Sequence, residues 1–256
     1  MIKKIITLFK LGRKIAHSDI LEIISKFQKP PLAITLLFKF LSISFSPKKK
    51  DSIKSEGERL SDSLESMGTT FIKLGQFLAT RPDIIGENLS KQLENLQDKL
   101  PPFSLIHAKE IVKNDLGQET YDSIINLSEP VAAASIAQVH KAQINDNGTI
   151  KDVAIKILRP NIKKIFNDEI DAIMLFAFLV ESFIKKTKRL KLVEVVFLLK
   201  EITNLEMDLR FEAAAANEYA ENTKNDVGFR VPEIYWNFTS ENVMTLDWVD
   251  GISIRE

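Results

Sequence analysis

The spacing of apolar side chains is helical over the first half of the chain. Between residues 60 and 78, apolar positions recur at steps of three and four, which is the repeat of a helix that packs on one face. These positions are Leu60, Leu64, Met67, Phe71, Leu74 and Leu78. The helix is predicted to end at Arg81-Pro82-Asp83, and two shorter helices are predicted near residues 87–97 and 104–116.

The pattern changes to that of strands after Pro130. Residues 136–144 alternate in part between apolar and polar, residues 145–148 read Asn-Asp-Asn-Gly, and residues 153–158 form an apolar run rich in β-branched residues. An Asn-Gly pair between two such runs is typical of a hairpin turn. The sequence therefore predicts a β-hairpin that Arg159-Pro160 closes.

Helices and then strands are predicted beyond the hairpin. Two long helical patterns run roughly over residues 162–186 and 192–222. The nine apolar residues at 172–180 suit a buried helix better than a membrane span, which needs about 20. Two last strands are predicted over residues 230–237 and 242–249, around a short turn.

Composition and charge narrow the functional classes. The 256 residues are 45% apolar, enough to bury a full core. The absence of cysteine excludes disulfides, thiolate metal sites and cysteine nucleophiles. Formal charges sum to zero, but residues 1–50 hold eleven Lys or Arg and two Asp or Glu, whereas residues 204–256 hold four and eleven. No nucleic-acid partner is expected.

The basic residues 1–50 are predicted to form a variable helical arm, with helices broken at Pro30-Pro31 and Pro47. The apolar stretch 31–45 contains Lys39 and is shorter than a membrane span of about 20 residues. The start has no long apolar core and no small-residue cleavage site, so we expect an uncleaved, cytoplasmic start. Peripheral contact with a membrane surface and packing of the arm on the domain are the two alternatives.

The clearest chemical signal is Lys156, at the end of the sequence Val-Ala-Ile-Lys. In kinase-type folds a strand lysine at this place grips the α- and β-phosphates of ATP and is held by a carboxylate from the next helix. Alone, such a lysine would more often solvate the edge of a sheet. The hairpin that precedes it gives Lys156 the context of a phosphate-binding residue.

Upstream lies an alanine-rich segment, at the place where a kinase carries its glycine-rich phosphate loop. Its small residues Ala132, Ala133, Ala134 and Ser135 would let the backbone approach a nucleotide closely, and the Ser135 hydroxyl could reach a phosphate. The start of a helix and a tightly packed strand are the alternatives. Because alanine has less freedom than glycine at positive φ, this segment should be stiffer than a glycine-rich loop.

A carboxylate partner for the lysine is expected on a following helix, where Glu206, Asp208 and Glu212 are candidates. Asp208 and Glu212 are four residues apart, so on one helix they would share a face and repel each other unless a cation lay between them. Glu206 has Arg210 four residues further on, and a surface ion pair with it is the alternative interpretation.

A glycine inside the first predicted helix belongs to a fourth motif, Lys73-Leu-Gly75-Gln76. Glycine in the middle of a helix costs about 1 kcal/mol relative to alanine, which indicates close approach of another backbone or of a ligand. Lys73 and Gln76 are three residues apart and therefore share a helix face.

Together, the four motifs resemble the UbiB family of atypical kinase-like proteins in their order and spacing. The family signature is a KxGQ helix, an alanine-rich loop in place of the glycine-rich loop, and an ExD motif just before the helix glutamate that pairs with the strand lysine. The matching segments are Lys73–Gln76, Val131–His140, Lys156 and Glu206–Asn217. The resemblance covers the chain from about Ser55 onward.

The resemblance implies a role for each matching residue. Lys156 and Glu212 would form the catalytic ion pair, and the residues from Ala132 to Ser135 would cover the phosphates of the nucleotide together with Lys156.

Across the implied pocket, Lys73, Gly75 and Gln76 would face Glu206 and Asp208. The KxGQ helix would then occupy the space where a protein kinase admits a peptide.

The resemblance also implies ATP and Mg²⁺ as cofactors, kinase or ATPase-type activity, and a role in ubiquinone (coenzyme Q) biosynthesis. The implied partners are a membrane surface, an isoprenoid lipid or ubiquinone precursor, and other ubiquinone-biosynthesis proteins, at the cytoplasmic face of the inner membrane. Older labels call bacterial members polyprenylphenol hydroxylases. No motif in the sequence resembles a flavin or haem site, so we interpret that label as naming the pathway step supported.

One part of the family pattern is missing from the sequence. The catalytic-loop Asp and Asn and the Asp-Phe-Gly metal site should follow the last strand, yet none of the histidines His17, His107 and His140 begins such a loop. We therefore expect the metal ligands beyond the chain end and interpret the chain as an N-terminal fragment, so that its status as an enzyme is open. The alternative function is a non-catalytic nucleotide- or lipid-binding scaffold.

The predicted fold is α+β: a kinase-like N-lobe with an antiparallel sheet and a helical insertion, preceded by a helical extension and without a C-lobe. Three regions are predicted: an arm over residues 1–50, a helical KxGQ region over 51–125 and the N-lobe over 126–256.

Overall fold

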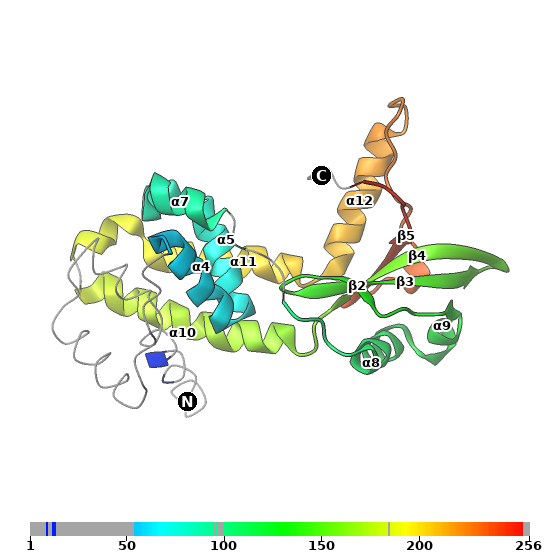
Figure 1. The fold of residues 1–256 in the computed structure, drawn as a ribbon, viewed down its shortest axis with the longest axis horizontal. Helices are drawn as coiled ribbons and strands as arrows, with labels where there is room; N and C mark the ends of the chain where they lie inside the picture. The colour runs from blue at the N-terminus through cyan, green and yellow to red at the C-terminus, as the bar shows by residue number, and fades with distance from the viewer. Residues whose placement is uncertain are drawn as a thin grey trace. The chain divides into compact units, whose positions relative to one another are not determined.

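The computed structural model describes residues 9, 12–13, 54–94, 96, 100–183 and 185–252 (Figure 1). The chain divides into two compact units. The helical unit consists of Met1–Asp98 and Lys163–Ile202, and the sheet unit of Lys99–Ile162 and Thr203–Glu256. Apart from residues 9, 12 and 13, the predicted N-terminal arm lies outside the described residues, so its helices and its membrane contact stay predictions.

The KxGQ region of the helical unit is made of short helices. They are α4 (Glu56–Met67), α5 (Thr69–Ala79), α6 (Pro82–Ile85) and α7 (Glu87–Leu93). α4 starts at a capping box, in which the Ser55 hydroxyl accepts the N–H of Glu58 and the Glu58 carboxylate accepts the N–H of Ser55. The single helix predicted over residues 60–78 is in fact two, because Gly68 between them has a φ of 104°, which side chains other than glycine rarely adopt.

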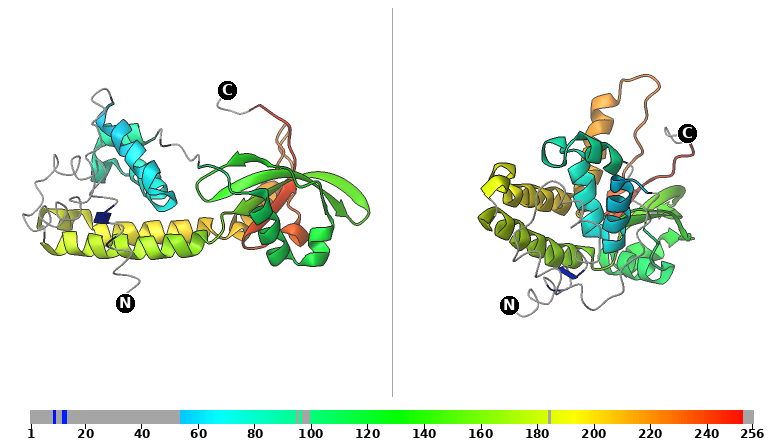
Figure 2. Two further views of the ribbon diagram at one scale, coloured as in Figure 1. Left: turned by 60° about the horizontal axis from the view of Figure 1, so that its bottom comes forward. Right: turned by 60° about the vertical axis from the view of Figure 1, so that its left-hand side comes forward.

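The predicted helical insertion supplies further helices of this unit. It contains α10 (Ile162–Phe183), the 3₁₀ helix η1 (Lys185–Leu190) and α11 (Leu192–Glu206). α10 and α11 run side by side (Figure 2), and the Lys200 ammonium of α11 lies 3.2 Å from the Asp171 carboxylate of α10. Leu175 and Phe178 of the apolar run at residues 172–180 are exposed, so the prediction of a buried helix is right for one face only.

The sheet unit is built on an antiparallel sheet of five strands. They are β1 (Ile124–Ile125), β2 (Pro130–Ala133), β3 (Ala137–Asp146), β4 (Thr149–Leu158) and β5 (Val243–Asp247). Their order is β1-β3-β4-β5, with β2 also paired to β3. The predicted hairpin is confirmed as β3 and β4. Its turn residues Asn147 and Gly148 have φ values of 51° and 87°, and positive φ at both positions is what a two-residue type I′ turn requires.

One face of the sheet is buried under two helices, which Figure 1 shows below the strands. These helices are α8 (Leu105–Leu116) and α9 (Gln118–Asp122). Because side chains alternate along a strand, Val153, Ile155 and Ile157 of β4 point into this core. Ala154 and Lys156 therefore lie on the opposite face, which we call the outer face of the sheet.

The strand predicted over residues 230–237 is wrong. This segment makes an isolated bridge between Ile234 and Leu246 and then turns into the 3₁₀ helix η2 (Trp236–Phe238). Pro232 has no N–H to donate to a strand ladder, which is one physical reason why the pairing does not extend. The strand predicted over residues 242–249 is confirmed as β5.

The long helix predicted over residues 192–222 is also wrong, because it is interrupted. The structure has α11 and then a separate helix, α12 (Leu209–Thr223). Asp208 between them has φ −125° and ψ 97°, an extended conformation, and it caps α12.

The helices are divided between the two units, and the region boundaries predicted after residues 50 and 125 stay predictions. α8 and α9 belong to the sheet unit, while α10 apart from Ile162 belongs to the helical unit. The combination of an antiparallel sheet with helices confirms the predicted α+β class. Within the described part of the chain, no helix is both long enough and apolar enough to cross a bilayer.

Candidate functional site

The outer face of the sheet carries an ion pair between Lys156 and Glu212. Lys156 lies in β4, opposite Val139 of β3 and Met244 of β5. Its Nζ atom lies 2.7 Å from each carboxylate oxygen of Glu212, which stands in the first turn of α12. The two side chains are 25% and 49% exposed, so an anionic ligand can reach the lysine from solvent. The structure thus brings together the two residues that the family resemblance pairs.

The alanine-rich segment forms the end of β2 and the turn into β3. Ala132 and Ala133 pair with β3, and the N–H of Ala134 closes the turn by donating to the Ala137 carbonyl at 2.8 Å. The segment is therefore a strand and a tight turn, and not the start of a helix. The Ser135 side chain is completely buried, so its hydroxyl does not face a ligand in this structure. That these residues cover a phosphate stays a prediction.

Arg159, the residue directly after β4, holds this turn through hydrogen bonds to its backbone. Its Nε and Nη2 atoms donate to the Ala134 carbonyl at 3.0 and 2.8 Å. Nη1 donates to the Pro101 carbonyl at 2.9 Å and Nη2 to the Leu100 carbonyl at 3.2 Å. The sequence showed Arg159 only as the residue that ends the hairpin, since the carbonyls it contacts are backbone groups that no motif reveals.

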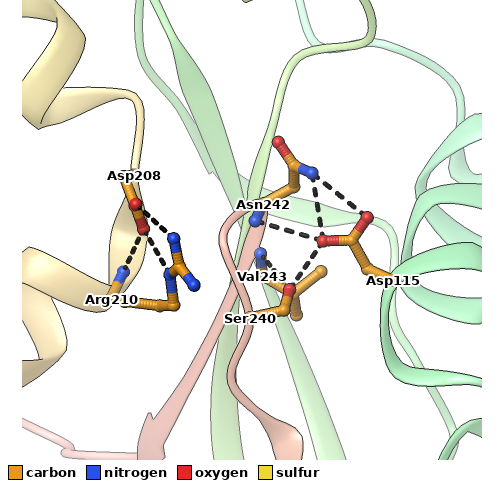
Figure 3. Close-up of polar contacts among 6 residues, drawn as sticks. All are labelled: Asp115, Asp208, Arg210, Ser240, Asn242 and Val243. Atoms are coloured by element: carbon orange, nitrogen blue, oxygen red, sulfur yellow. Dashed lines mark hydrogen bonds and ion pairs between the residues drawn. The ribbon is translucent and has the colours of Figure 1, made fainter.

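The two ExD residues lie on either side of the break between α11 and α12: Glu206 is the last residue of α11, and Asp208 caps the start of α12 (Figure 3). The Asp208 carboxylate accepts the N–H of Arg210 at 3.2 Å and the guanidinium of the same residue at 2.9 and 2.7 Å. This hydrogen bond raises the pKa of Arg210. Arg210 thus forms its ion pair with Asp208, whereas the sequence suggested an ion pair with Glu206. Asp208 and Glu212 do not share a helix face as predicted, because Asp208 is extended and precedes the helix.

A second carboxylate, Asp115, fixes the turn that leads into β5 (Figure 3). It accepts the Ser240 hydroxyl at 2.7 Å, the Asn242 N–H at 3.2 Å and the Asn242 side-chain amide at 3.0 and 3.1 Å. In the same turn, the Glu241 carbonyl accepts the N–H of Leu209, the first residue of α12. The Asp115 cluster (Asp115, Ser240 and Asn242) therefore links α8 to β5, the strand beside the one that carries Lys156, and to α12, the helix that carries Glu212. No motif in the sequence indicates this cluster.

The KxGQ residues Lys73, Gly75 and Gln76 lie on α5 of the helical unit. A Cβ atom on Gly75 would come within 2.8 Å of the Leu64 side chain and 2.7 Å of the Leu96 side chain. The prediction that a backbone or a ligand comes close to this glycine is not what the structure shows, because its close neighbours are the side chains of Leu64 and Leu96. The predicted meeting of Lys73 and Gln76 with the ExD residues joins different units and stays a prediction.

A buried histidine network lies on the core face of the sheet. The Gln138 amide bonds both backbone groups of Phe103, and its Nε2 lies 2.9 Å from His140 Nε2. The other ring nitrogen, Nδ1, lies 2.7 Å from the Ser128 carbonyl. A neutral ring that carries its proton on Nδ1 satisfies every contact, since the Gln138 amide can donate to Nε2. Burial lowers the pKa of His140 against the opposing effect of the Ser128 carbonyl.

The end of β5 is anchored by Asp247. Its carboxylate accepts the Tyr235 hydroxyl at 2.6 Å and the Arg230 guanidinium at 2.8 Å. Burial and this carboxylate raise the pKa of Tyr235 to about 12. No group of three or more His, Asp or Glu side chains among the described residues is arranged to hold a metal ion.

A strand lysine paired with a helix glutamate, beside a turn of small residues, defines the site as that of a kinase-like N-lobe. Residues 95–256 match the model of the family described as "ABC1 atypical kinase-like domain". The chain belongs to this family, and the predicted kinase-like N-lobe fold is thereby confirmed.

Several relatives share the name "Probable protein kinase UbiB", which confirms the resemblance. The chain is 36% identical over 203 residues to the protein of Marinobacter nauticus, which covers 79% of this chain and 37% of that protein. It is 35% identical over 227 residues to that of Cellvibrio japonicus, covering 88% and 40%. With the protein of Pseudomonas paraeruginosa it shares 30% identity over 250 residues, covering 97% and 46%. The chain thus spans less than half the length of these relatives.

Proposed function

We propose that this chain forms the ATP-binding N-lobe of an atypical kinase or ATPase that supports ubiquinone biosynthesis at a membrane. The observation that carries the proposal is the ion pair between Lys156 and Glu212, formed across 56 residues of sequence. In kinase-like folds, this pair positions the lysine ammonium for the α- and β-phosphates of ATP.

The residues around the pair fit a polyphosphate ligand. Lys156 offers a fixed positive charge, and Glu212 restricts its ammonium to one position without covering it, since both side chains are partly exposed. The exposed Ala132 has no side chain beyond Cβ that would keep a ligand from the backbone. Bound Mg²⁺ would neutralise phosphate charge, and we propose that its protein ligands lie outside this N-lobe.

The role in ubiquinone biosynthesis rests on membership of the family and on the UbiB motifs. The same holds for an isoprenoid lipid or ubiquinone precursor as ligand and for other proteins of the pathway as partners. Peripheral association with the cytoplasmic face of the inner membrane rests on the eleven Lys or Arg within residues 1–50, since such segments are attracted to anionic lipids.

The first test is Mg²⁺-dependent ATP binding by the full-length protein, measured by calorimetry. Lys156→Ala should weaken ATP binding by about 10- to 100-fold, because one hydrogen bond from a charged group contributes roughly 1.5–3 kcal/mol. Glu212→Gln should weaken it less, because the lysine remains but is no longer held. The control is Lys113→Ala, which removes an exposed lysine from α8, the helix on the other face of the sheet.

Equal ATP affinity in the wild type and in Lys156→Ala would refute the nucleotide site. A full-length protein that binds no ATP would also refute it, and the scaffold would then be the better account. The pathway role is tested separately, by whether the full-length gene restores ubiquinone in a bacterium that lacks its own UbiB, and whether Lys156→Ala fails to do so.

A further inference from the structure

We propose that Arg159 is a positioning residue, which locks the alanine-rich turn in one conformation and thereby sets how tightly the site binds the phosphates of a nucleotide. The part that concerns phosphate rests on the proposed function. The locking of the turn is independent of it.

The guanidinium of Arg159 donates hydrogen bonds to three backbone carbonyls. Two of its nitrogens donate to the one Ala134 carbonyl oxygen, and the Leu100 and Pro101 carbonyls each accept a further bond. A planar fork of five N–H groups is the side chain that can serve three carbonyls at once. Lysine has a single nitrogen and cannot reproduce this arrangement.

The backbone of Arg159 holds the other end of the same turn. Its N–H donates to the Ile136 carbonyl at 2.8 Å, while its side chain holds the Ala134 carbonyl. One residue therefore holds the Ala134–Ser135 peptide group through its side chain and the Ile136–Ala137 peptide group through its backbone. Because a peptide group is planar, the Ala134–Ser135 peptide cannot flip without breaking both bonds to the guanidinium.

The position of the turn connects this lock to Lys156. In the β3–β4 register, Ala137 lies opposite Leu158 and Val139 lies opposite Lys156. The turn therefore lies at the same end of the hairpin as the lysine ammonium. Any ligand held by Lys156 on the outer face would have the turn as its neighbour, so a loosened turn should affect the part of the ligand nearest Lys156.

The segment of Leu100 and Pro101, whose carbonyls also accept bonds from the guanidinium, is itself held in place. Phe103, just beyond Pro101, is bonded through both backbone groups to Gln138 of β3, and its ring lies 6.0 Å from the Arg159 guanidinium carbon. The lock therefore connects the turn to a rigid part of the core. Such an anchor does not suit a glycine-rich loop that moves over its phosphates. It suits a turn that stays in one position.

The test compares ATP with adenosine, which lacks phosphates, in the full-length protein. Arg159→Gln should weaken Mg²⁺-ATP binding about tenfold and leave adenosine affinity within about twofold, since only the phosphate end adjoins the turn. Arg159→Lys should behave like Arg159→Gln despite its charge. Arg81→Gln, which removes a partly exposed guanidinium of the helical unit bound to Asp83, should change neither affinity.

Hydrogen exchange without nucleotide gives an independent measurement. Amides of residues 131–137 should exchange faster in Arg159→Gln than in the wild type or Arg81→Gln. Unchanged exchange would overturn the lock, and an equal loss of ATP and adenosine affinity would reduce Arg159 to a residue needed only for stability. If the wild type binds neither ligand, the proposed function fails together with the phosphate half of this inference, while faster exchange would still support the lock.

Discussion

Replacing Asp115 by alanine tests whether the Asp115 cluster holds the sheet unit together. The substitution leaves three donor groups without their acceptor: the Ser240 hydroxyl, the Asn242 N–H and the Asn242 side-chain amide. All three contacts are partly buried, and they cross 125 to 127 residues of sequence.

The expected loss of stability follows from these contacts. A hydrogen bond to a charged group contributes roughly 1.5–3 kcal/mol, and the lower end applies because water can reach this half-buried site. Three such bonds amount to about 4.5 kcal/mol. Asp115 also lies in the last turn of α8, where the helix dipole disfavours a carboxylate by up to about 1 kcal/mol. The net cost of Asp115→Ala is therefore about 3.5–4.5 kcal/mol.

Tryptophan fluorescence during urea unfolding measures this loss of stability in the sheet unit, which contains Asp115. The chain has two tryptophans, Trp236 and Trp248, and both belong to the sheet unit. The matched control is Asp122→Ala, which removes an exposed carboxylate of α9 that accepts one bond from Gln118 at 2.6 Å. The control should cost no more than about 0.5 kcal/mol.

An Asp115→Ala variant that loses less than about 1 kcal/mol, or no more than the control, would refute the reasoning. Asp115→Asn refines the test. It keeps one oxygen as acceptor but turns an NH₂ group toward the remaining donors, so its loss should approach that of the alanine variant. A fully stable Asp115→Asn would show that shape, and not acceptor chemistry, holds the turn.

Two further predictions concern the other buried contacts. The pKa of His140 is lowered from 6.5 in the folded state, so the unfolded chain takes up more protons below that pH. The contribution of His140 to the free energy of unfolding should therefore be constant above about pH 7. It should fall as pH decreases below about 6.5, by at most about 1.4 kcal/mol per pH unit. His140→Gln should remove this part of the slope in urea unfolding between pH 5 and 8. Gly75→Ala should destabilise the helical unit by about 1 kcal/mol in thermal melts followed by circular dichroism, since displacing Leu64 and Leu96 costs about 1–3 kcal/mol and the helix propensity of alanine returns about 1.

Each of these predictions has its own control. His107→Gln removes an exposed histidine of α8 and should leave the pH slope unchanged; a slope that survives in His140→Gln would exclude His140 as its source. For Gly75→Ala, the double variant with Leu96→Ala should show a coupling energy of about 0.5 kcal/mol or more, because the second change makes room for the new methyl group. Simple additivity would mean that the overlap with Leu96 is not the cause.

The sequence predicted those features of the site that depend on near neighbours. An Asn-Gly pair imposes a two-residue turn whatever it is attached to, so the hairpin and the strand bearing Lys156 could be identified directly. The glycine at position 75 indicated a close approach, but the neighbours are leucine side chains and not the backbone or ligand predicted.

Breaks within long helical patterns were less predictable. The apolar repeat continues through Gly68 and through Asp208, and both residues can stand inside a helix. Whether such a residue bends the chain or continues it depends on what the helices on either side pack against. The periodicity shows which face is buried and not which neighbour buries it.

By itself, the sequence determined the α+β class, the hairpin and the residue types of the site, because these follow from local backbone preferences and from motifs in order. Only the tertiary structure decided that Lys156 meets Glu212, that Arg159 holds the Ala134 carbonyl and that Asp115 holds the turn before β5. These contacts join segments 25 to 125 residues apart, and two of them end on backbone or hydroxyl groups that any sequence could supply. Their formation depends on the packing of the whole unit, which is why no local pattern records them.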